Sequence, residues 1–159
     1  MPTRSSKIFQ FKIALLEVSP PVWRTIQVPA TYSFWDLHVA IQDAMGWKDC
    51  HLHEFQILNP TGQCEDHIGI PDGDPFKGDK PFLAGWDVRI SDYFSPENPT
   101  AHYIYDFGDD WRHVVQLEEI LPRAQGIRYP LCLAGQRKCP PAVFRERKTA
   151  GISTYEWST

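Results

Sequence analysis

The sequence predicts a single α+β domain, in which a mixed or antiparallel sheet carries one principal helix. Short segments alternate apolar and polar residues, a pattern typical of half-buried strands. Fourteen prolines argue against a helical bundle and fit short strands joined by stiff connections. A length of 159 residues with 42% apolar content is enough for one sizeable core.

The first elements are predicted from their periodicity. Residues 7–18 and 22–28 alternate with period two, and the Ser-Pro-Pro turn signal between them favours an antiparallel hairpin. Ser33 is a suitable N-cap for a helix that carries an apolar stripe at helical spacing and stops at Gly46. Residues 50–58 then alternate as a third strand. The chain therefore begins with a ββαβ order, which resembles a β-grasp arrangement.

The densest segment runs from Tyr103 to His113 and holds four aromatic residues, three carboxylates and an imidazole. Its alternation predicts a hairpin that turns at Gly108-Asp109-Asp110 and supplies central strands of the sheet. Between residues 59 and 80, Pro, Gly and Asp predict an excursion of loops, within which Ile68 and Ile70 fit a short edge strand.

Charge is distributed unevenly along the chain. Residues 1–120 contain nine Lys and Arg against eighteen Asp and Glu, whereas residues 121–159 contain seven against two. The acidic body would repel a phosphate backbone, so only the basic C-terminal part is suited to nucleic acid. No apolar run approaches the ~18 residues that a membrane span requires, and no hydrophobic leader is visible. We therefore expect a cytoplasmic protein that does not enter membranes.

Four ordered motifs occur together: Pro-Pro-Val-Trp-Arg at residues 20–24, His-Leu-His-Glu-Phe at 51–55, the Tyr103 to His113 segment, and Tyr129-Pro130 followed by Cys132, Gly135 and Cys139-Pro140-Pro141. In this combination the chain resembles the plasmid pRiA4b ORF-3-like family over about residues 7–141. The resemblance implies a compact α+β domain, an association with plasmids and mobile elements, and no established reaction.

The resemblance divides the chain into a family-like domain at residues 1–141 and an atypical basic tail at residues 142–159. Family members typically continue after the Cys-Pro-Pro motif with acidic residues and a Gly-Gly pair. Here the segment 142–148, Ala-Val-Phe-Arg-Glu-Arg-Lys, stands in their place. We expect a truncated or out-of-frame terminus.

The first candidate site is a metal site built on His51 and His53. On a strand, residues i and i+2 point to the same side, so both imidazoles would be offered to zinc or another divalent metal. Cys132 and Cys139 would complete the site if their proline-stiffened loop folds over that face. The alternative is that the histidines pack against neighbouring rings and hydrogen-bond backbone groups.

The second candidate site consists of Asp106, Asp110 and His113, which together could hold magnesium or manganese for phosphodiester chemistry. The alternative for Asp110, and for Asp109 beside it, is conformational, because Asp is favoured at turns. Asp106 is less easily explained in this way, since the pattern places it on a strand.

No sequence signature of a serine or cysteine nucleophile is present, and none of the four cysteines has a recognisable activating context. The sequence therefore favours a non-catalytic binding or accessory module for an unknown protein or small ligand. The alternative is a metal-dependent hydrolase or nuclease that uses His51, His53, Asp106 and His113.

Overall fold

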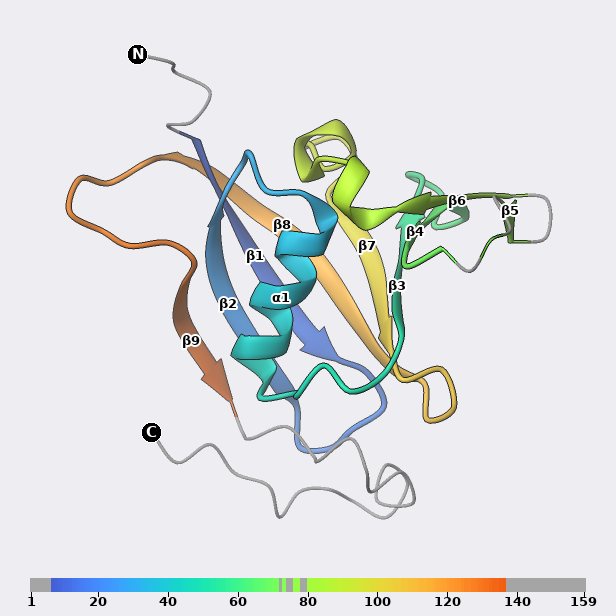
Figure 1. The fold of residues 1–159 in the computed structure, drawn as a ribbon. Helices are drawn as coiled ribbons and strands as arrows, with labels where there is room; N and C mark the ends of the chain where they lie inside the picture. The colour runs from blue at the N-terminus through green and yellow to red at the C-terminus, as the bar shows by residue number, and fades with distance from the viewer. Residues whose placement is uncertain (1–6, 72, 74–75, 78–79, 137–159) are drawn as a thin grey trace.

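The computed structural model describes residues 7–71, 73, 76–77 and 80–136, in which one α-helix lies against a curved sheet (Figure 1). The helix is α1 (Phe34–Met45), and short 3₁₀ turns follow later at η2 (Gly85–Asp87) and η3 (Ile90–Asp92). The strands are β1 (Lys7–Leu15), β2 (Val22–Pro29), β3 (His53–Leu58), β4 (Cys64–Gly69), β5 (Phe76–Lys77), β6 (Lys80–Ala84), β7 (Thr100–Tyr105), β8 (Trp111–Pro122) and β9 (Leu131–Gln136). No helix in this part of the chain is long and apolar enough to cross a membrane.

The strand order among the described residues is β5-β6-β4-β3-β7-β8-β1-β2-β9. Neighbouring strands pair antiparallel except β4 and β6, which pair parallel. The predicted α+β class, the mixed sheet and the ββαβ beginning are therefore confirmed. The hairpin formed by β7 and β8 lies in the middle of this order, where the sequence pattern places it.

Helix α1 begins and ends where its sequence predicts. The Ser33 hydroxyl accepts from the Asp36 backbone N–H at 3.1 Å, and the Asp36 carboxylate accepts from the Ser33 N–H at 3.0 Å. This capping box satisfies backbone donors that the first helical turn leaves without partners. Gly46 ends the helix with a φ of 81°, a left-handed conformation that glycine adopts without steric cost.

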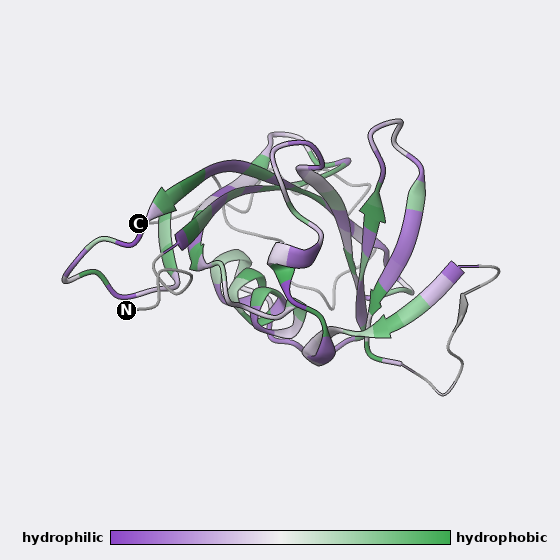
Figure 2. Ribbon diagram, turned by 90° about the horizontal axis from the view of Figure 1, so that it is seen from above, coloured by the Kyte–Doolittle hydropathy of each residue, from purple (hydrophilic) through white to green (hydrophobic). Residues whose placement is uncertain are grey.

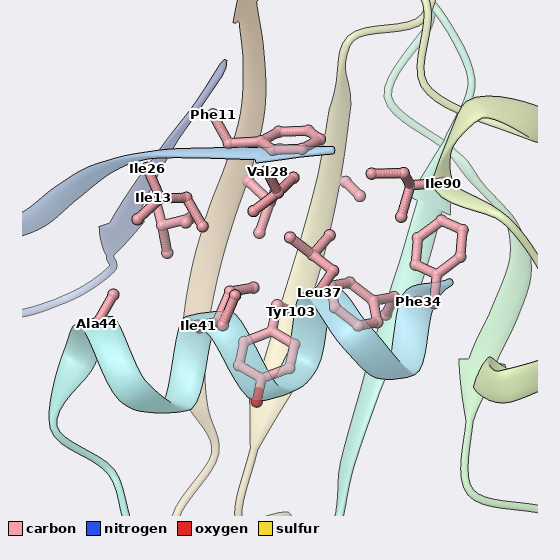
Figure 3. Close-up of a cluster of buried hydrophobic side chains, with 14 of the residues drawn as sticks. Phe11, Ile13, Ile26, Val28, Phe34, Leu37, Ile41, Ala44, Ile90 and Tyr103 are labelled. Atoms are coloured by element: carbon pink, nitrogen blue, oxygen red, sulfur yellow. The ribbon is translucent and has the colours of Figure 1, made fainter. Parts of the chain in front are cut away.

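The core lies between α1 and the face of the sheet that curves around it (Figure 2). Side chains of β1 and β2 meet those of the helix there, and Figure 3 shows both sets pointing toward one another. The members labelled in that view are Phe11, Ile13, Ile26, Val28, Phe34, Leu37, Ile41, Ala44, Ile90 and Tyr103. Burial of these apolar side chains, at ~25 cal/mol per Å², is the main force that holds the helix to the sheet.

A buried cation, Arg24, sits on the core face of β2 between Val22 and Ile26 and is 0% exposed. Its Nε donates to the Ala44 carbonyl at 2.9 Å, and its Nη1 donates to the Trp23 carbonyl at 2.7 Å. Ala44 lies in the last turn of α1, where carbonyls lack helical partners and favour a positive charge. The arginine of the Pro-Pro-Val-Trp-Arg motif therefore caps the C-terminal end of the helix.

The glycine of the C-terminal motif makes room for this arginine. Gly135 on β9 pairs with Arg24, and a Cβ at Gly135 would lie only 2.6 Å from Arg24 Cδ. Two motifs that are more than a hundred residues apart therefore serve one packing arrangement.

Three strands differ from the sequence prediction in their ends or in their place in the sheet. Strand β3 begins at His53, so residues 50–52 precede it rather than extend it. Strand β4 covers residues 64–69 and lies inside the sheet between β3 and β6, not at an edge. Strand β7 ends at Tyr105, because Asp106 has a φ of 67° and starts the turn. A left-handed residue cannot continue an extended strand.

We expect the substitution Arg24→Met to lower the free energy of unfolding by about 2–3 kcal/mol, because a hydrogen bond from a charged group contributes ~1.5–3 kcal/mol and a buried carbonyl loses its donor. Urea unfolding followed by circular dichroism measures the change. Arg89→Met is the matched control, since Arg89 is exposed and also donates to a carbonyl, that of Thr31 at 2.7 Å. The control should lose less than about 1 kcal/mol, and equal losses would contradict the capping role.

Candidate functional site

A buried polar network lies between α1 and β7, centred on the Tyr103 hydroxyl. His38 Nδ1 lies 2.7 Å from this hydroxyl, and Gln42 Nε2 donates to it at 2.9 Å. His38 Nε2 lies 2.9 Å from the Asp49 carboxylate, and the Asp49 N–H donates to Gln42 Oε1 at 2.7 Å. Because a carboxylate only accepts, His38 carries its proton on Nε2 and accepts the Tyr103 O–H through Nδ1. Each hydrogen-bond donor of this network thus has an acceptor within the network.

His53 stacks on His38 and is also inside the core. The two ring centroids are 3.5 Å apart with an interplanar angle of 7°, and His53 is only 2% exposed. Burial and the neighbouring His38 lower the pKa of His53 to about 3. Burial lowers the pKa of His38 as well, although the Asp49 carboxylate opposes this shift. Both rings are therefore neutral near pH 7, and two neutral imidazoles can stack without charge repulsion.

The three described residues of the predicted metal site are not brought together. His51 precedes β3, so it does not share a strand face with His53. Cys132 is exposed on β9, and strands β7, β8, β1 and β2 lie between β3 and β9 in the sheet order. Cys139 lies outside the described residues, as does the predicted basic tail. Among the residues that the structure describes, no group of three or more His, Cys, Asp or Glu could hold a metal ion.

The three candidate catalytic residues also have separate surroundings. His113 is 0% exposed, its Nδ1 lies 3.0 Å from the Tyr103 carbonyl, and its Nε2 accepts from Trp47 Nε1 at 3.3 Å. Both ring nitrogens are therefore engaged in the core. Asp110 lies in the turn with its carboxylate half exposed and 3.5 Å from Arg112. The expectation that His113 and Asp110 share a site with Asp106 receives no support from this geometry.

Asp106 is the candidate that has a buried carboxylate oxygen without a hydrogen-bond partner in the described structure. It is 4% exposed and has a left-handed backbone with a φ of 67°. Its N–H donates to the Leu52 carbonyl at 2.8 Å, and its Oδ1 accepts from the Asp109 N–H at 3.3 Å. Its Oδ2 points to His51 Nε2 at 3.6 Å, which is too long for a hydrogen bond. Both of these atoms are buried, and neither has a hydrogen-bond partner within the described structure.

Each member of this pair is followed in the chain by an exposed apolar residue. Leu52 follows His51 in the chain and is 54% exposed, and Phe107 follows Asp106 and is 43% exposed. We refer to His51, Leu52, Asp106 and Phe107 as the His51–Asp106 corner. It combines a carboxylate oxygen and an imidazole nitrogen with exposed apolar residues next to them in the chain.

A second polar cluster, which the sequence did not reveal, lies on the sheet face opposite to α1. Cys64 Sγ is 3.7 Å from His67 Nε2, and His67 Nδ1 is 3.1 Å from Glu54 Oε2. The only available signal was the Cys-x-x-His spacing. On a regular strand that spacing places the two side chains on opposite faces, so it gave no reason to pair them.

The buried histidine pair predicts a pH dependence of stability. Unfolded His53 takes up a proton below the ordinary histidine pKa of 6.5, whereas the folded protein resists protonation there until about pH 3. The stabilising contribution is therefore fully present above pH 6.5 and is lost as the pH falls toward 3. We expect His53→Phe, which keeps a stacking ring, to make the slope of unfolding free energy between these values shallower by up to about 1.4 kcal/mol per pH unit.

Urea unfolding at a series of pH values measures this slope. Trp35→Phe is the control, because it alters a ring that packs on His53, at 5.9 Å between centroids, without removing a titrating group. The control should keep the wild-type slope. An unchanged slope in His53→Phe would show that His53 is not the group responsible.

Comparison with known proteins relates the chain to one family. The model of the plasmid pRiA4b ORF-3-like protein family matches residues 7–150. The uncharacterised protein y4hQ of Sinorhizobium fredii is 34% identical over 136 residues, which make up 86% of this chain and 66% of that protein. This chain therefore spans just under two thirds of the relative's length.

A solved structure agrees with this relationship. The crystal structure of MM3350 from Methanosarcina mazei Go1, a protein of unknown function, is similar with a TM-score of 0.79 and 44% sequence identity. The match covers 90% of this chain and 79% of the other. Because the family model spans most of the sequence and the fold agrees as well, the chain belongs to the plasmid pRiA4b ORF-3-like family.

Proposed function

We propose that the protein is a non-catalytic binding module that holds the amine group of a small ligand at the His51–Asp106 corner. The observation that carries this proposal is the pair of buried atoms Asp106 Oδ2 and His51 Nε2, 3.6 Å apart and without hydrogen-bond partners in the described structure. A buried polar atom without a partner destabilises the fold by ~1–3 kcal/mol. A ligand that donates a hydrogen bond to Asp106 Oδ2 would remove this cost.

The charge of the surroundings favours a cationic donor. Asp106 provides a carboxylate acceptor, and residues 1–120 contain twice as many acidic as basic residues, eighteen against nine. Hydrogen bonds between charged groups are about twice as strong as neutral ones. An ammonium group therefore suits this corner better than a carboxylate or a phosphate.

The border of the corner favours a ligand with an apolar body. The exposed parts of Leu52 and Phe107 would be removed from water by such a body, at a gain of ~25 cal/mol per Å² of apolar area. The proposed ligand class is an amine attached to an aromatic or aliphatic group.

A metal-dependent hydrolase or nuclease is the second candidate. Imidazole and carboxylate are common ligands of divalent metals, and His51 and Asp106 face one another closely enough to share an ion. They supply only two ligands, and the described residues add no third His, Cys, Asp or Glu. The binding role is therefore favoured. A cytoplasmic location, and contact with nucleic acid through the basic tail, remain predictions from the sequence.

Titration of the protein with phenethylamine tests the proposed ligand class. We expect changes in the amide NMR signals of residues 51–52 and 106–107, and binding weakened at least about tenfold by Asp106→Asn, since the lost hydrogen bond to a charged group is worth ~1.5–3 kcal/mol. The matched control is Asp110→Asn, which changes an exposed carboxylate of the same turn and should leave binding unaltered.

A second compound and a metal ion separate the remaining outcomes. Phenylpropionate has a similar apolar body but carries a carboxylate, so equal binding of both compounds would contradict an amine site. Titration with Mn²⁺, read from the paramagnetic broadening of the same amide signals, tests the second candidate. Broadening that disappears in Asp106→Asn, together with no effect of phenethylamine, would favour the metal-dependent role.

A further inference from the structure

Three side chains contact one another in sequence on the sheet face opposite to α1: those of Cys64, His67 and Glu54. Cys64 Sγ lies 3.7 Å from His67 Nε2, and His67 Nδ1 lies 3.1 Å from Glu54 Oε2. Glu54 is 1% exposed and His67 is 9% exposed, whereas Cys64 is partly open to solvent. We refer to these three residues as the Cys64 cluster.

The contacts within the cluster assign a role to each group. The Glu54 carboxylate accepts a hydrogen bond from the Nδ1–H of His67. The other ring nitrogen, Nε2, therefore carries a lone pair, which is directed to the thiol. A nucleophile, a base within reach, and a third group that orients the base are the arrangement that activates cysteine and serine nucleophiles. Nothing about the overall fold requires a thiol beside an imidazole.

A local irregularity of β4 creates this arrangement. Ile57 pairs with Asp66 and Leu58 pairs with Cys64, so Glu65 is an extra residue in the ladder. Such a bulge changes the side to which the following side chains point. Cys64 and His67, which are three positions apart, therefore approach one another although a regular strand would separate them.

Further contacts hold the carboxylate of the cluster in place. Gln56 Nε2 donates to Glu54 Oε2 at 2.8 Å, and Arg112 Nη1 donates to Gln56 Oε1 at 3.2 Å. On the other side the ring of Phe82 stacks against His67, with centroids 6.3 Å apart and an interplanar angle of 15°. The imidazole is thus oriented by a hydrogen bond at one edge and by packing on its face.

The other charged and titratable groups near the cluster come from the neighbouring strands. Arg112 reaches over from β8, and His102 of β7 pairs with Gln56 and has a pKa lowered by burial and by Arg112. On β4 itself, Glu65 is exposed and the Asp66 carbonyl lies 3.6 Å from Cys64 Sγ. This carbonyl competes with His67 for the thiol proton, so His67→Asn would leave the thiol with the carbonyl as its acceptor.

We infer that Cys64 is a reactive thiol that exchanges with small-molecule disulfides, with His67 as the base and Glu54 as the positioning residue. His67 Nε2 takes the thiol proton, and the thiolate attacks one sulfur of the disulfide. The S–S bond of the disulfide breaks, a new S–S bond to Cys64 forms, and the departing thiolate recovers the proton from His67. One thiol and one disulfide give one mixed disulfide and one thiol, without any other oxidant.

This inference is independent of the proposed amine site, because the two sites lie at different places and use different residues. The sequence patterns indicated no activating context for any of the four cysteines. The context is supplied by Glu54 of another strand and by a bulge, neither of which is visible as a sequence motif.

The test measures how fast each cysteine of the reduced full chain reacts with dithiodipyridine at pH 6.5, with peptide mass spectrometry to assign the site. An ordinary thiol has a pKa of about 8.5, so only about 1% is thiolate at this pH. We expect Cys64 to react at least about tenfold faster than Cys50 and Cys132, although both of these are more exposed. These two residues serve as internal references in the same sample.

Variants distinguish activation from simple accessibility. His67→Asn should lower the rate of Cys64 to that of the reference cysteines, and the matched control His102→Asn, on a neighbouring strand, should leave it within about twofold. Glu54→Gln should slow Cys64 at pH 6.5 and restore its rate near pH 9, because the thiol then ionises without help. A purely structural role of Glu54 would not produce such a shift of the pH profile.

Three outcomes would overturn the inference. Cys64 reacting no faster than Cys50 and Cys132 in the wild-type chain is one, and this measurement needs no variant to fold. A rate that is unchanged in a folded His67→Asn variant is the second. The third is reactivity that arises only after treatment with a chelator, since Cys64 and His67 would then be ligands of a metal ion.

Discussion

The structure depends on directional hydrogen bonds among polar groups that are buried beneath α1. The Tyr103 hydroxyl lies at the centre of the helix–sheet interface, and burial raises its pKa well above 10, so it remains protonated. His38 and Gln42 of the helix satisfy it, and Arg24 of β2 satisfies the end of the helix. Apolar packing alone would allow α1 to slide or rotate, because hydrophobic contacts are not directional. These hydrogen bonds have direction, and they set the position of the helix on the sheet.

The position of the helix in turn determines the path of the chain that follows it. Gly46 ends α1, and Asp49 is held by His38 and Gln42. The Cys50 N–H then donates to the Tyr105 hydroxyl at 2.8 Å, and the Leu52 carbonyl accepts from the Asp106 N–H at 2.8 Å. His51 is carried between these two contacts to its place opposite Asp106. The His51–Asp106 corner is thus a consequence of how the helix is seated, not of the strand that contains His53.

The two faces of the sheet offer different chemistry. On the helix side His38 and His53 are neutral and stacked, and they contribute to structure. On the opposite side His67 is joined to a carboxylate and lies beside a thiol. Both faces thus pair a histidine with a carboxylate, since His38 contacts Asp49, but only His67 also has a thiol beside it. The family relationship constrains the fold, whereas the chemistry of each site depends on its own residues.

Local sequence determined much of the architecture of this protein. Three features depend on residues that are close together in the chain: the period-two segments of β1 and β2, the capping box of α1, and the end of α1 at Gly46. The sequence alone therefore predicts them. The same holds for the β7–β8 hairpin in the centre of the sheet. The sequence placed Asp106 on a strand, whereas the structure shows that it starts the turn.

Tertiary structure decided which of the chemically active residues meet. Strand order placed Cys132 far from the histidines, and a left-handed Asp106 ended β7 where alternation had continued it. A bulge in β4 brought Cys64 to His67, and pairing with β3 added Glu54. Strand pairing and bulges arise from contacts between distant segments. The spacing of residues along one segment does not contain that information.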